Sequence, residues 1–593
     1  MSLSENTRDA LPDRVVRYPV VSAVVAITVI ALVIRLVALD GRIAHFDEGR
    51  MAHWALHYAE YGEYWYRPVN HGPFIHLVGG WMFSIFGASD VTARALVAVV
   101  GGLLPLSALL FRQYLTRVEV VAMATLLALD PVMLYYSRFF RNDILVGGFA
   151  FVAFGLILLA AHRRRPLYLY LGAVPLAFAF SAKENALVYV LCWLGAGGLV
   201  LAHVFYRSYT GEERGPGDVD ADPSGVGDGG TNRIHLVVDQ WRERFEVERD
   251  AIRAAAARWT LHGVGAAVVF LAVLVFFYAP RGVEGAAGFP GVIHEAIFEY
   301  HMAAYDHWVP EEGEDRLAYS TLFWRMFEPT VYASGAVLVL GVAGFVYELF
   351  ARERARLFVL AASYWGFASI VGYPLAASVE NPAWLIVHVV LPLSIPAAVA
   401  VGVLVRWAEE ARIDGDQVGV ALSAVILVSV LFGMVWVGYD TSFANSQSSE
   451  NVLVQYAQPE GEFHDELAAM ERAAAENEGV DVLYYGDDYY LANESESIRP
   501  PGPHGGGWHN RLPLPWYERA SGAETASEHD VAGLDAALED EPPIVIAEHS
   551  EFDAEPPADQ VTERIGDEYQ YEAYYLRAPG DPVVIYVHED YVE

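Results

Sequence analysis

The stretch YPVVSAVVAITVIALVIRLVAL, residues 18–39, is long and apolar enough to cross a hydrocarbon core of roughly 30 Å. It is too long for the apolar region of a signal peptide, and no A-x-A-like cleavage site follows it, so we expect a retained helix. Similar runs recur along the 593 residues, of which 54% are hydrophobic. The sequence therefore predicts a polytopic α-helical membrane protein.

Hydropathy predicts about eleven transmembrane helices. They are 18–39, 92–111, 118–136, 143–161, 166–181, 185–206, 259–279, 330–350, 356–375, 384–406 and 417–439. With the N-terminus inside, the arginines of the short loops fall mainly on the cytoplasmic side, which is the positive-inside pattern. We therefore expect a multi-pass protein of the cell membrane with a cytoplasmic N-terminus.

This orientation divides the chain into domains. We expect a cytoplasmic N-terminus at 1–17, a transmembrane domain at 18–439, and an acidic extracellular α/β domain at 440–593. In the last, VDVLYYG and PPIVIAEHS read as buried strands, and YQYEAYYLRA with PVVIYVHED as a terminal strand pair. Within the transmembrane domain lie outer loops at 40–91 and 280–329 and a cytoplasmic linker and helix at 207–258.

The charge of the chain is strongly acidic. The formal net charge is −37, Lys183 is the only lysine, and from residue 440 onward 35 Asp and Glu face 6 Arg. An acidic surface poor in lysine indicates a protein solvated in high salt, as in halophilic archaea. The sign argues against nucleic-acid binding, which needs a basic patch.

The outer loop after the first span concentrates polar chemistry. It contains HFDEGRMAHWALHYAEYGEYWYRPVNHGP, residues 45–73, with adjacent Asp47 and Glu48. Asp47 is either the N-cap of a helix over 49–60 or a carboxylate held among aromatics, whose raised pKa makes it a better base. The apolar stretch that follows predicts a re-entrant or interfacial helix carrying His71 and His76.

Two further outer segments carry charges. SRFFRND, residues 137–143, has Arg138, Arg141 and Asp143 in a very short turn, either anchored to lipid phosphate and capping a helix, or facing a substrate. SAKEN, residues 181–185, places Lys183 and Glu184 at the outer end of a span, either as an interfacial pair or as a compact point charge for an anion.

The loop 280–329 carries several histidines at near-helical spacing, which is typical of an interfacial amphipathic helix. Its spacing is not HExxH, so His301 and His307 are only weak candidates for metal ligands, and no metal is assigned. Cys192 stands alone, so the sequence has no disulfide framework.

These elements bring carboxylates, cations and aromatics to one outer surface. Water-soluble nucleotide sugars are made inside the cell, so glycosyl transfer at the outer face needs a donor carried by a lipid. A polyprenyl- or dolichyl-phosphate sugar fits that requirement.

The chain at this point resembles a known family. FDEGRMA, GEYWYRPVNHGPFIHLVGGWMFSIFG and the small-residue-rich span with Arg94 at its start are similar to the first outer loop and second span of GT-C glycosyltransferases. The closest are dolichyl-phosphate-mannose protein mannosyltransferases and the bacterial transferases that add aminoarabinose to lipid A. Within that superfamily the chain looks most like the archaeal flippase-activity-associated branch of protein glycosylation.

The resemblance implies a GT-C-like transmembrane domain with an outer soluble domain, and it implies roles for residues. Asp47 would be the catalytic carboxylate of an inverting transfer, with Glu48 as its support. The lipid phosphate would be neutralised by the four residues Arg138, Arg141, Lys183 and His71. The supporting residues would be Asp143, Glu184, Arg50 and Arg94. The family's basic-Pro-Pro motif is here HGP, and Asn70 stands where the lipid A transferases have a metal-associated Glu, which puts a divalent metal in doubt.

Two functions remain open. The first is transfer of a sugar from a polyprenyl- or dolichyl-phosphate donor to a hydroxyl of a glycan, protein or lipid. The second is a non-catalytic translocator or flippase-associated partner of other membrane proteins of N-glycosylation. A permease is a weaker third reading, because no internal repeat or broken helix pair is evident.

Overall fold

A computed structural model describes most of the chain. The described residues are 18–210, 249–282, 288–299, 301–302, 317–351, 355–376, 381–497, 506–549, 556–578, 580 and 582–592. The predicted cytoplasmic N-terminus, most of the predicted linker and helix at 207–258, and His307 lie outside these residues.

Within the described residues, nine helices are long and apolar enough to cross a membrane. Each coincides with a predicted span. They are α3 (Pro19–Leu36), α6 (Asp90–Leu103) with its continuation η2 (Leu104–Phe111), α9 (Asp143–Arg163), α11 (Ala186–Thr210), α13 (Arg249–Tyr278), α16 (Tyr319–Phe350), α17 (Leu357–Gly372), α18 (Val387–Asp414) and α19 (Gln417–Tyr439). The chain is a multi-pass membrane protein.

The other two predicted spans differ from expectation. The span at 166–181 is the shorter helix α10 (Leu167–Ala182). The span at 118–136 is broken into α7 (Arg117–Leu129) and α8 (Pro131–Tyr136), because Pro131 cannot continue the backbone hydrogen bonds of α7. The side chain of Asp130 caps the new helix by accepting a hydrogen bond from the Met133 amide at 3.1 Å.

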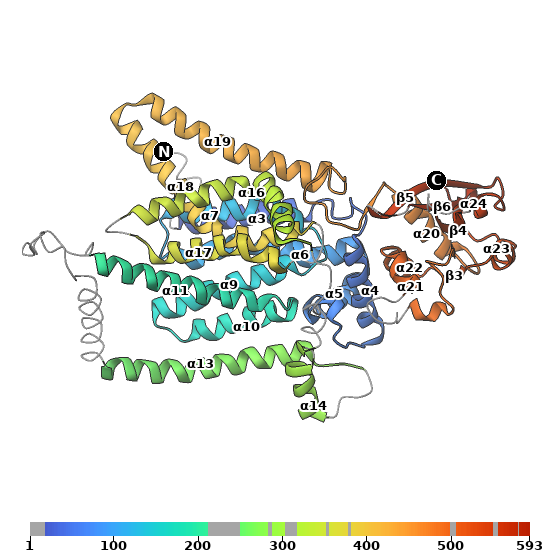
Figure 1. The fold of residues 1–593 in the computed structure, drawn as a ribbon, viewed down its shortest axis with the longest axis horizontal. Helices are drawn as coiled ribbons and strands as arrows, with labels where there is room; N and C mark the ends of the chain where they lie inside the picture. Colours follow the sequence, from blue (N-terminus) through green and yellow to red (C-terminus); the bar gives the residue numbers. More distant parts are fainter. Residues whose placement is uncertain are drawn as a thin grey trace, which may run out of the picture.

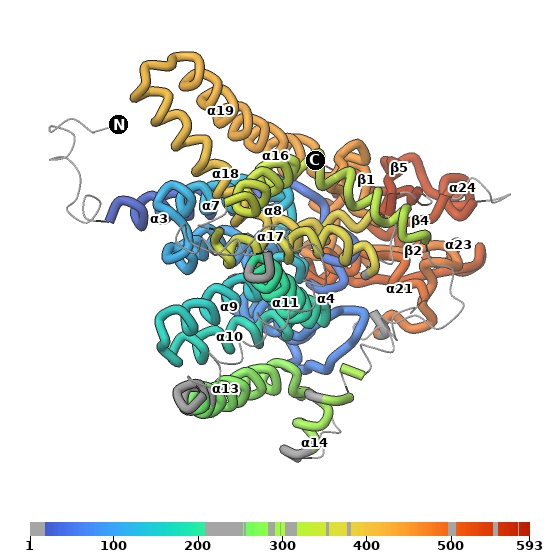
Figure 2. Tube along the Cα trace, turned by 60° about the vertical axis from the view of Figure 1, so that its left-hand side comes forward, coloured from blue at the N-terminus to red at the C-terminus, as the bar shows by residue number. Residues whose placement is uncertain are grey.

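The helices form one bundle whose interior is α18. In its most apolar window, 94% of the residues of α18 are buried, whereas α19 is mostly exposed along its length. Figures 1 and 2 show α13 on one side of the bundle beside α10, and α19 diverging from it on the opposite side. A helix that is apolar on all faces and buried on all faces is the expected centre of such a bundle.

Two helices and a short 3-10 turn cover one end of the bundle. They are α4 (Phe46–Tyr61), η1 (Pro68–Asn70) and α5 (Pro73–Phe86). Figure 1 shows α4 and α5 between the bundle and the C-terminal domain. The helix α5 matches the expected re-entrant or interfacial helix and carries His76, whereas His71 precedes it in the loop.

The predicted outer loop 280–329 is partly described. It contains α14 (Gly288–His294) and a π-helical turn, η3 (Glu295–Glu299), and α16 begins eleven residues before the predicted span. The ring of His301 lies 4.9 Å from that of Tyr278, so packing on α13 holds this part of the loop against the bundle.

The C-terminal domain is built on a six-stranded mixed sheet. Its strands are β1 (Gln458–Glu460), β2 (Val482–Tyr485), β3 (Thr525–Glu528), β4 (Ile544–Glu548), β5 (Tyr569–Ala578) and β6 (Val583–His588), in the order β1-β5-β6-β4-β2-β3. The strand β2 pairs in parallel with β3 and β4, and the terminal pair β5–β6 is antiparallel as predicted. Its helices are α20 (His464–Glu476), α21 (Gly506–Arg511), α22 (Leu514–Ser521), α23 (Val531–Leu538) and α24 (Pro557–Thr562).

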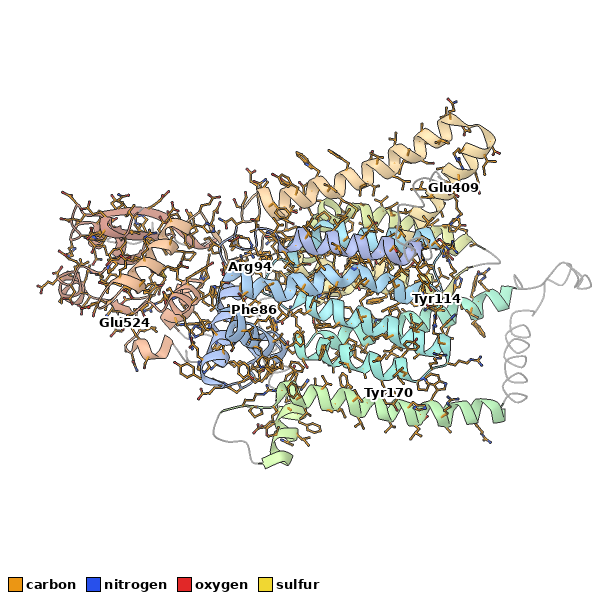
Figure 3. All side chains as sticks on the ribbon, turned by 180° about the vertical axis from the view of Figure 1, so that it is seen from behind. Phe86, Arg94, Tyr114, Tyr170, Glu409 and Glu524 are labelled. Atoms are coloured by element: carbon orange, nitrogen blue, oxygen red, sulfur yellow. The ribbon has the colours of Figure 1, made fainter. Side chains whose placement is uncertain are left out.

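The C-terminal domain docks on the end of the bundle through α22. Trp516 Nε1 and the Tyr517 hydroxyl donate hydrogen bonds to the two carboxylate oxygens of Asp90, at 2.8 and 2.9 Å. Arg519 pairs with Glu60 of α4 at 2.6 Å. Figure 3 shows Arg94, one turn from Asp90, at the end of the bundle that faces this domain. These contacts fix the domain directly above α4.

Candidate active site

The start of α4 sets the direction of its two acids. His45, not Asp47, is the N-cap: its Nδ1 accepts from the Asp47 amide at 3.0 Å, and its own amide donates to Glu48 at 2.9 Å. The expectation that Asp47 might only cap the helix is therefore wrong. Because His45 and Glu48 satisfy the helix end, the Asp47 carboxylate is released for other contacts.

Asp47 lies between two guanidinium groups. Its Oδ1 is 2.5 Å from Arg50 and its Oδ2 is 3.2 Å from Arg141, while the side chain remains 20% exposed. Burial by itself raises the pKa of Asp47, but the charges of Arg141 and Arg50 outweigh it and hold the pKa well below its usual range. The expected raised pKa is thus wrong, and Asp47 is an anion in the empty site.

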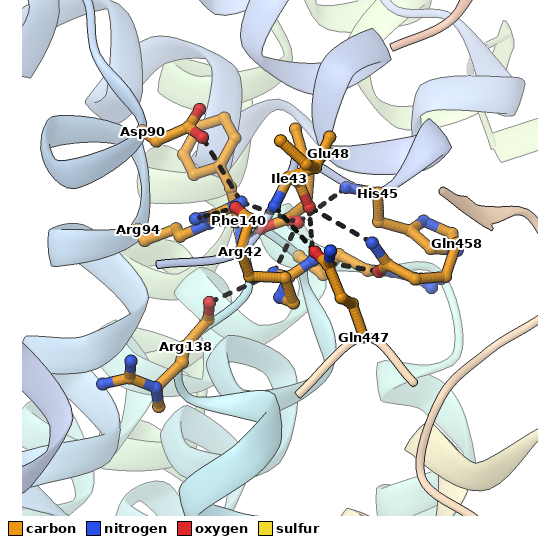
Figure 4. A network of polar contacts seen from close by, with 12 residues as sticks. Arg42, Ile43, His45, Glu48, Asp90, Arg94, Arg138, Phe140, Gln447 and Gln458 are labelled. Atoms are coloured by element: carbon orange, nitrogen blue, oxygen red, sulfur yellow. Dashed lines mark hydrogen bonds and ion pairs between the residues drawn. The ribbon is translucent and has the colours of Figure 1, made fainter. Parts of the chain in front are cut away.

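Glu48 has a different environment from its neighbour. It is 2% exposed and accepts hydrogen bonds from Arg42 at 2.6 Å, from Arg94 at 3.1 Å and from the Phe140 amide at 2.7 Å. Burial raises the pKa of Glu48, but Arg42 and Arg94 lower it well below its usual range. Figure 4 shows this carboxylate at the centre of a polar network that also reaches Gln458 of the C-terminal domain. Glu48 therefore joins the elements around the site and does not face a substrate.

The charges of Asp47 continue into the segment between α8 and α9. Arg141 Nε lies 4.0 Å from Asp143 Oδ2, and Asp143 Oδ1 accepts from Lys183 Nζ at 2.8 Å. Together, Arg50, Asp47, Arg141, Asp143 and Lys183 form an alternating chain of three cations and two carboxylates, called here the charged chain. It carries one more positive than negative charge, so it is suited to an additional anion.

Arg138, grouped with Arg141 in the sequence, has a different place. Its guanidinium donates to the carbonyls of Val37 and Ala38, both at 2.6 Å, at the end of α3. These carbonyls are the unsatisfied acceptors of a helix C-terminus, so Arg138 acts as a cap. Its expected contact with the phosphate of a donor therefore lacks a free guanidinium, and Arg138 is not brought to the charged chain.

His71 borders the charged chain beside Glu184. Its Nδ1 lies 3.0 Å from Glu184 Oε2, and the Tyr66 hydroxyl donates to Glu184 Oε1 at 2.6 Å. Burial and the neighbouring charge of Lys183 lower the pKa of His71, so at neutral pH it does not add the positive charge expected of it. A Cβ at Gly72 would lie 2.2 Å from the Ser181 carbonyl oxygen, so glycine permits this loop to reach the end of α10.

Three residues that the sequence reasoning missed enclose Asp143 and Arg141. His388 of α18 is fully buried, hydrogen-bonds through Nδ1 to the Tyr189 hydroxyl, and places Nε2 3.9 Å from Asp143. Gln455, in the link between α19 and β1, is hydrogen-bonded to Arg141. An ionisable residue in an apolar span is a signal of function that could have identified His388, whereas no local signal distinguishes Gln455.

The described residues do not provide a metal site. They include no group of three His, Cys, Asp or Glu side chains that could hold an ion. The Asp47 and Asp143 carboxylates each pair with cationic side chains, and these pairs occupy the oxygens that a divalent ion would need. His301 lies against Tyr278, and His307 lies outside the described residues.

Apolar helices, a charged chain at one end of the bundle and an α/β domain above it define a polytopic membrane protein of the GT-C fold. Residues 70–210 match the family model of dolichyl-phosphate-mannose-protein mannosyltransferase, and residues 463–589 match that of the Agl23 flippase-associated protein C-terminal domain. The resemblance to GT-C glycosyltransferases is thus confirmed.

Solved structures give the same fold. Apo ArnT from Cupriavidus metallidurans has a TM-score of 0.50 at 16% identity, covering 96% of this chain and 98% of that chain. ArnT bound to undecaprenyl phosphate gives 0.49 at 16%, covering 95% and 97%. The oligosaccharyltransferase of Archaeoglobus fulgidus gives 0.48 at 14%, covering 91% and 70%. No curated protein matches the sequence.

Proposed function

We propose that the protein is an inverting glycosyltransferase that moves a sugar from a polyprenyl- or dolichyl-phosphate donor to an acceptor hydroxyl at the outer membrane face. The observation that carries the proposal is the charged chain. Its excess positive charge matches the single negative charge of a phosphodiester between lipid and sugar. The mannosyltransferase model that matches residues 70–210 supports the same class of donor.

In this mechanism Arg141 and Lys183 bind the phosphate that leaves with the lipid. Both side chains are nearly buried, at 7% and 10% exposed, so their charges act in a medium of low dielectric. The acceptor hydroxyl attacks the anomeric carbon on the face opposite the phosphate. Its proton passes to Asp47, and the electron pair of the broken bond stays on the phosphate.

Binding of the donor would also prepare the base. In the empty site Arg141 contacts Asp47, which lowers its affinity for a proton. A phosphate on Arg141 competes for that guanidinium and adds a negative charge nearby, so the pKa of Asp47 rises when the donor is bound. A carboxylate that gains basicity only in the complex is suited to general base catalysis.

Removal of the Lys183 charge tests the proposed phosphate site. Lys183→Met leaves Asp143 buried and unpaired, so Lys183→Met with Asp143→Asn is the balanced variant. We expect this double variant to release dolichyl phosphate from a lipid-linked hexose about 10²-fold more slowly, because one preorganised charge on the leaving group is lost. Lys183→Arg is the control that retains the charge, and it should retain most of the activity. Equal rates in all three proteins would contradict the proposal.

A change in pH dependence tests the coupling of Asp47 to its arginines. Asp47 must be ionised to act, and its depressed pKa places the acidic limb of the rate profile below the usual range of a carboxylate. Arg50→Gln removes one of the two charges, so we expect the limb to move upward by about 1 pH unit. Arg519→Gln, which removes a guanidinium paired with Glu60, should leave the limb in place.

The second candidate is a non-catalytic translocator or flippase-associated partner in N-glycosylation. Two observations favour it: the description of the domain model at 463–589, and the pairing of both Asp47 oxygens with arginines. A translocator needs the phosphate-binding cations and no base. Comparison of lipid-linked sugars and glycans in a deletion strain and its parent separates the two, because loss of transfer causes charged donor to accumulate.

A further inference from the structure

A small hollow lies beside the charged chain. Its volume is about 290 Å³, and it is lined by Trp54, Glu63, Tyr64, Trp65, Arg67, Asn70, His71 and His76. This is at the lower limit of small-molecule pockets, so it suits a single ring better than a lipid chain. His71 connects the two regions, because it lines the hollow and also contacts Glu184, the residue after Lys183.

Two buried acceptors line this hollow. Asn70 and His76 are 3% and 2% exposed, and neither Asn70 Oδ1 nor His76 Nε2 has a hydrogen-bond partner in the described part of the chain. His76 Nδ1 lies 3.3 Å from the Gly72 carbonyl oxygen. Since a carbonyl only accepts, Nδ1 carries the proton of the neutral ring and Nε2 presents a lone pair.

These atoms define the chemistry of the occupant. Buried acceptors without partners cost free energy, so their native partner is a group that donates. A phosphate is itself an acceptor and would be repelled, whereas adjacent hydroxyls of a sugar donate to two acceptors at once. The aromatic side chains of Trp54, Tyr64 and Trp65 supply the apolar surface that a sugar ring packs against.

We infer that this hollow is the donor-sugar subsite and that it holds a monosaccharide through hydrogen bonds from two of its hydroxyls to Asn70 and His76. The inference rests on the proposed function, because the charged chain would bind the phosphate of the same donor. It assigns recognition of the sugar to the loop and helix 70–76, and recognition of the phosphate to Arg141 and Lys183.

Binding of two lipids to the purified full-length protein tests the subsite. The probes are dolichyl phosphate and dolichyl phosphate mannose. Asn70→Leu with His76→Phe should bind dolichyl phosphate as the wild type does, and dolichyl phosphate mannose about 10-fold more weakly, because two hydrogen bonds are lost. Ser84→Ala, in which a hydroxyl bonded to its own helix is removed from α5, is the matched control and should change neither affinity.

The outcomes separate the subsite from the function. Unchanged affinity for both lipids in the variant, or equal loss of both, would overturn the subsite and leave the phosphate site standing. Failure of the wild type to bind either lipid would overturn the proposed function itself. A measurement on the wild type needs no variant: donors with a 2-deoxy or a 3-deoxy sugar should include at least one bound about 10-fold more weakly, and equal affinity for both and for the parent donor would overturn the subsite.

Discussion

Asp47→Asn is expected to lower the rate of sugar transfer by as much as about 10⁴-fold, the upper range of what a general base contributes. Asparagine keeps the size of the side chain and removes the group that accepts the proton. Since His45 and Glu48 cap α4, the substitution leaves the helix end intact. The measurement is single-turnover release of dolichyl phosphate from a lipid-linked hexose by the purified protein.

Lipid binding separates loss of chemistry from loss of the site. In Asp47→Asn, Arg50 and Arg141 lose a counter-charge, so the affinity for dolichyl phosphate should stay the same or increase. Asp40→Asn, an exposed acid seven residues earlier, is the control and should be fully active. If Asp47→Asn cells assemble glycans normally while cells lacking the Lys183 charge do not, the translocator is the correct function.

The sequence identified the acids and cations of the site better than it separated their roles. Asp47, Arg141, Asp143 and Lys183 were predicted to meet from their positions at the ends of spans, and the structure joins them. The sequence could not separate Arg138 from Arg141, because their difference depends on which side of a short turn faces the carbonyls of α3. Such a contact between distant segments leaves no local pattern.

The membrane helices were predictable because hydropathy reports burial in lipid directly. The break of the predicted span 118–136 at Asp130 and Pro131 follows a local rule that the apolar composition of the run concealed. The place of the link with Gln455 was not predictable, because it depends on how the C-terminal domain docks. Sequence therefore indicated the charged end of the bundle, and packing selected which charges meet.

Glu48→Gln is expected to lower the free energy of unfolding by about 3–5 kcal/mol, the usual cost of removing one partner from a buried ion pair. Arg42 and Arg94 are 5% and 1% exposed, so water cannot replace the lost carboxylate. The control is Glu60→Gln on the same helix, whose pair with Arg519 is 40% exposed on the glutamate side and should contribute less than about 1 kcal/mol. Thermal unfolding of the purified proteins in detergent measures both.

The pH dependence of this effect identifies its origin. The pKa of Glu48 is lower in the folded than in the unfolded protein, so its contribution is complete above the unfolded pKa of about 4.3 and disappears as the pH falls through the folded pKa. The difference between wild type and Glu48→Gln should therefore be constant near pH 7 and shrink in strong acid. A difference that persists unchanged in strong acid would assign the loss to side-chain packing, since the charge of Glu48 is then absent from both proteins.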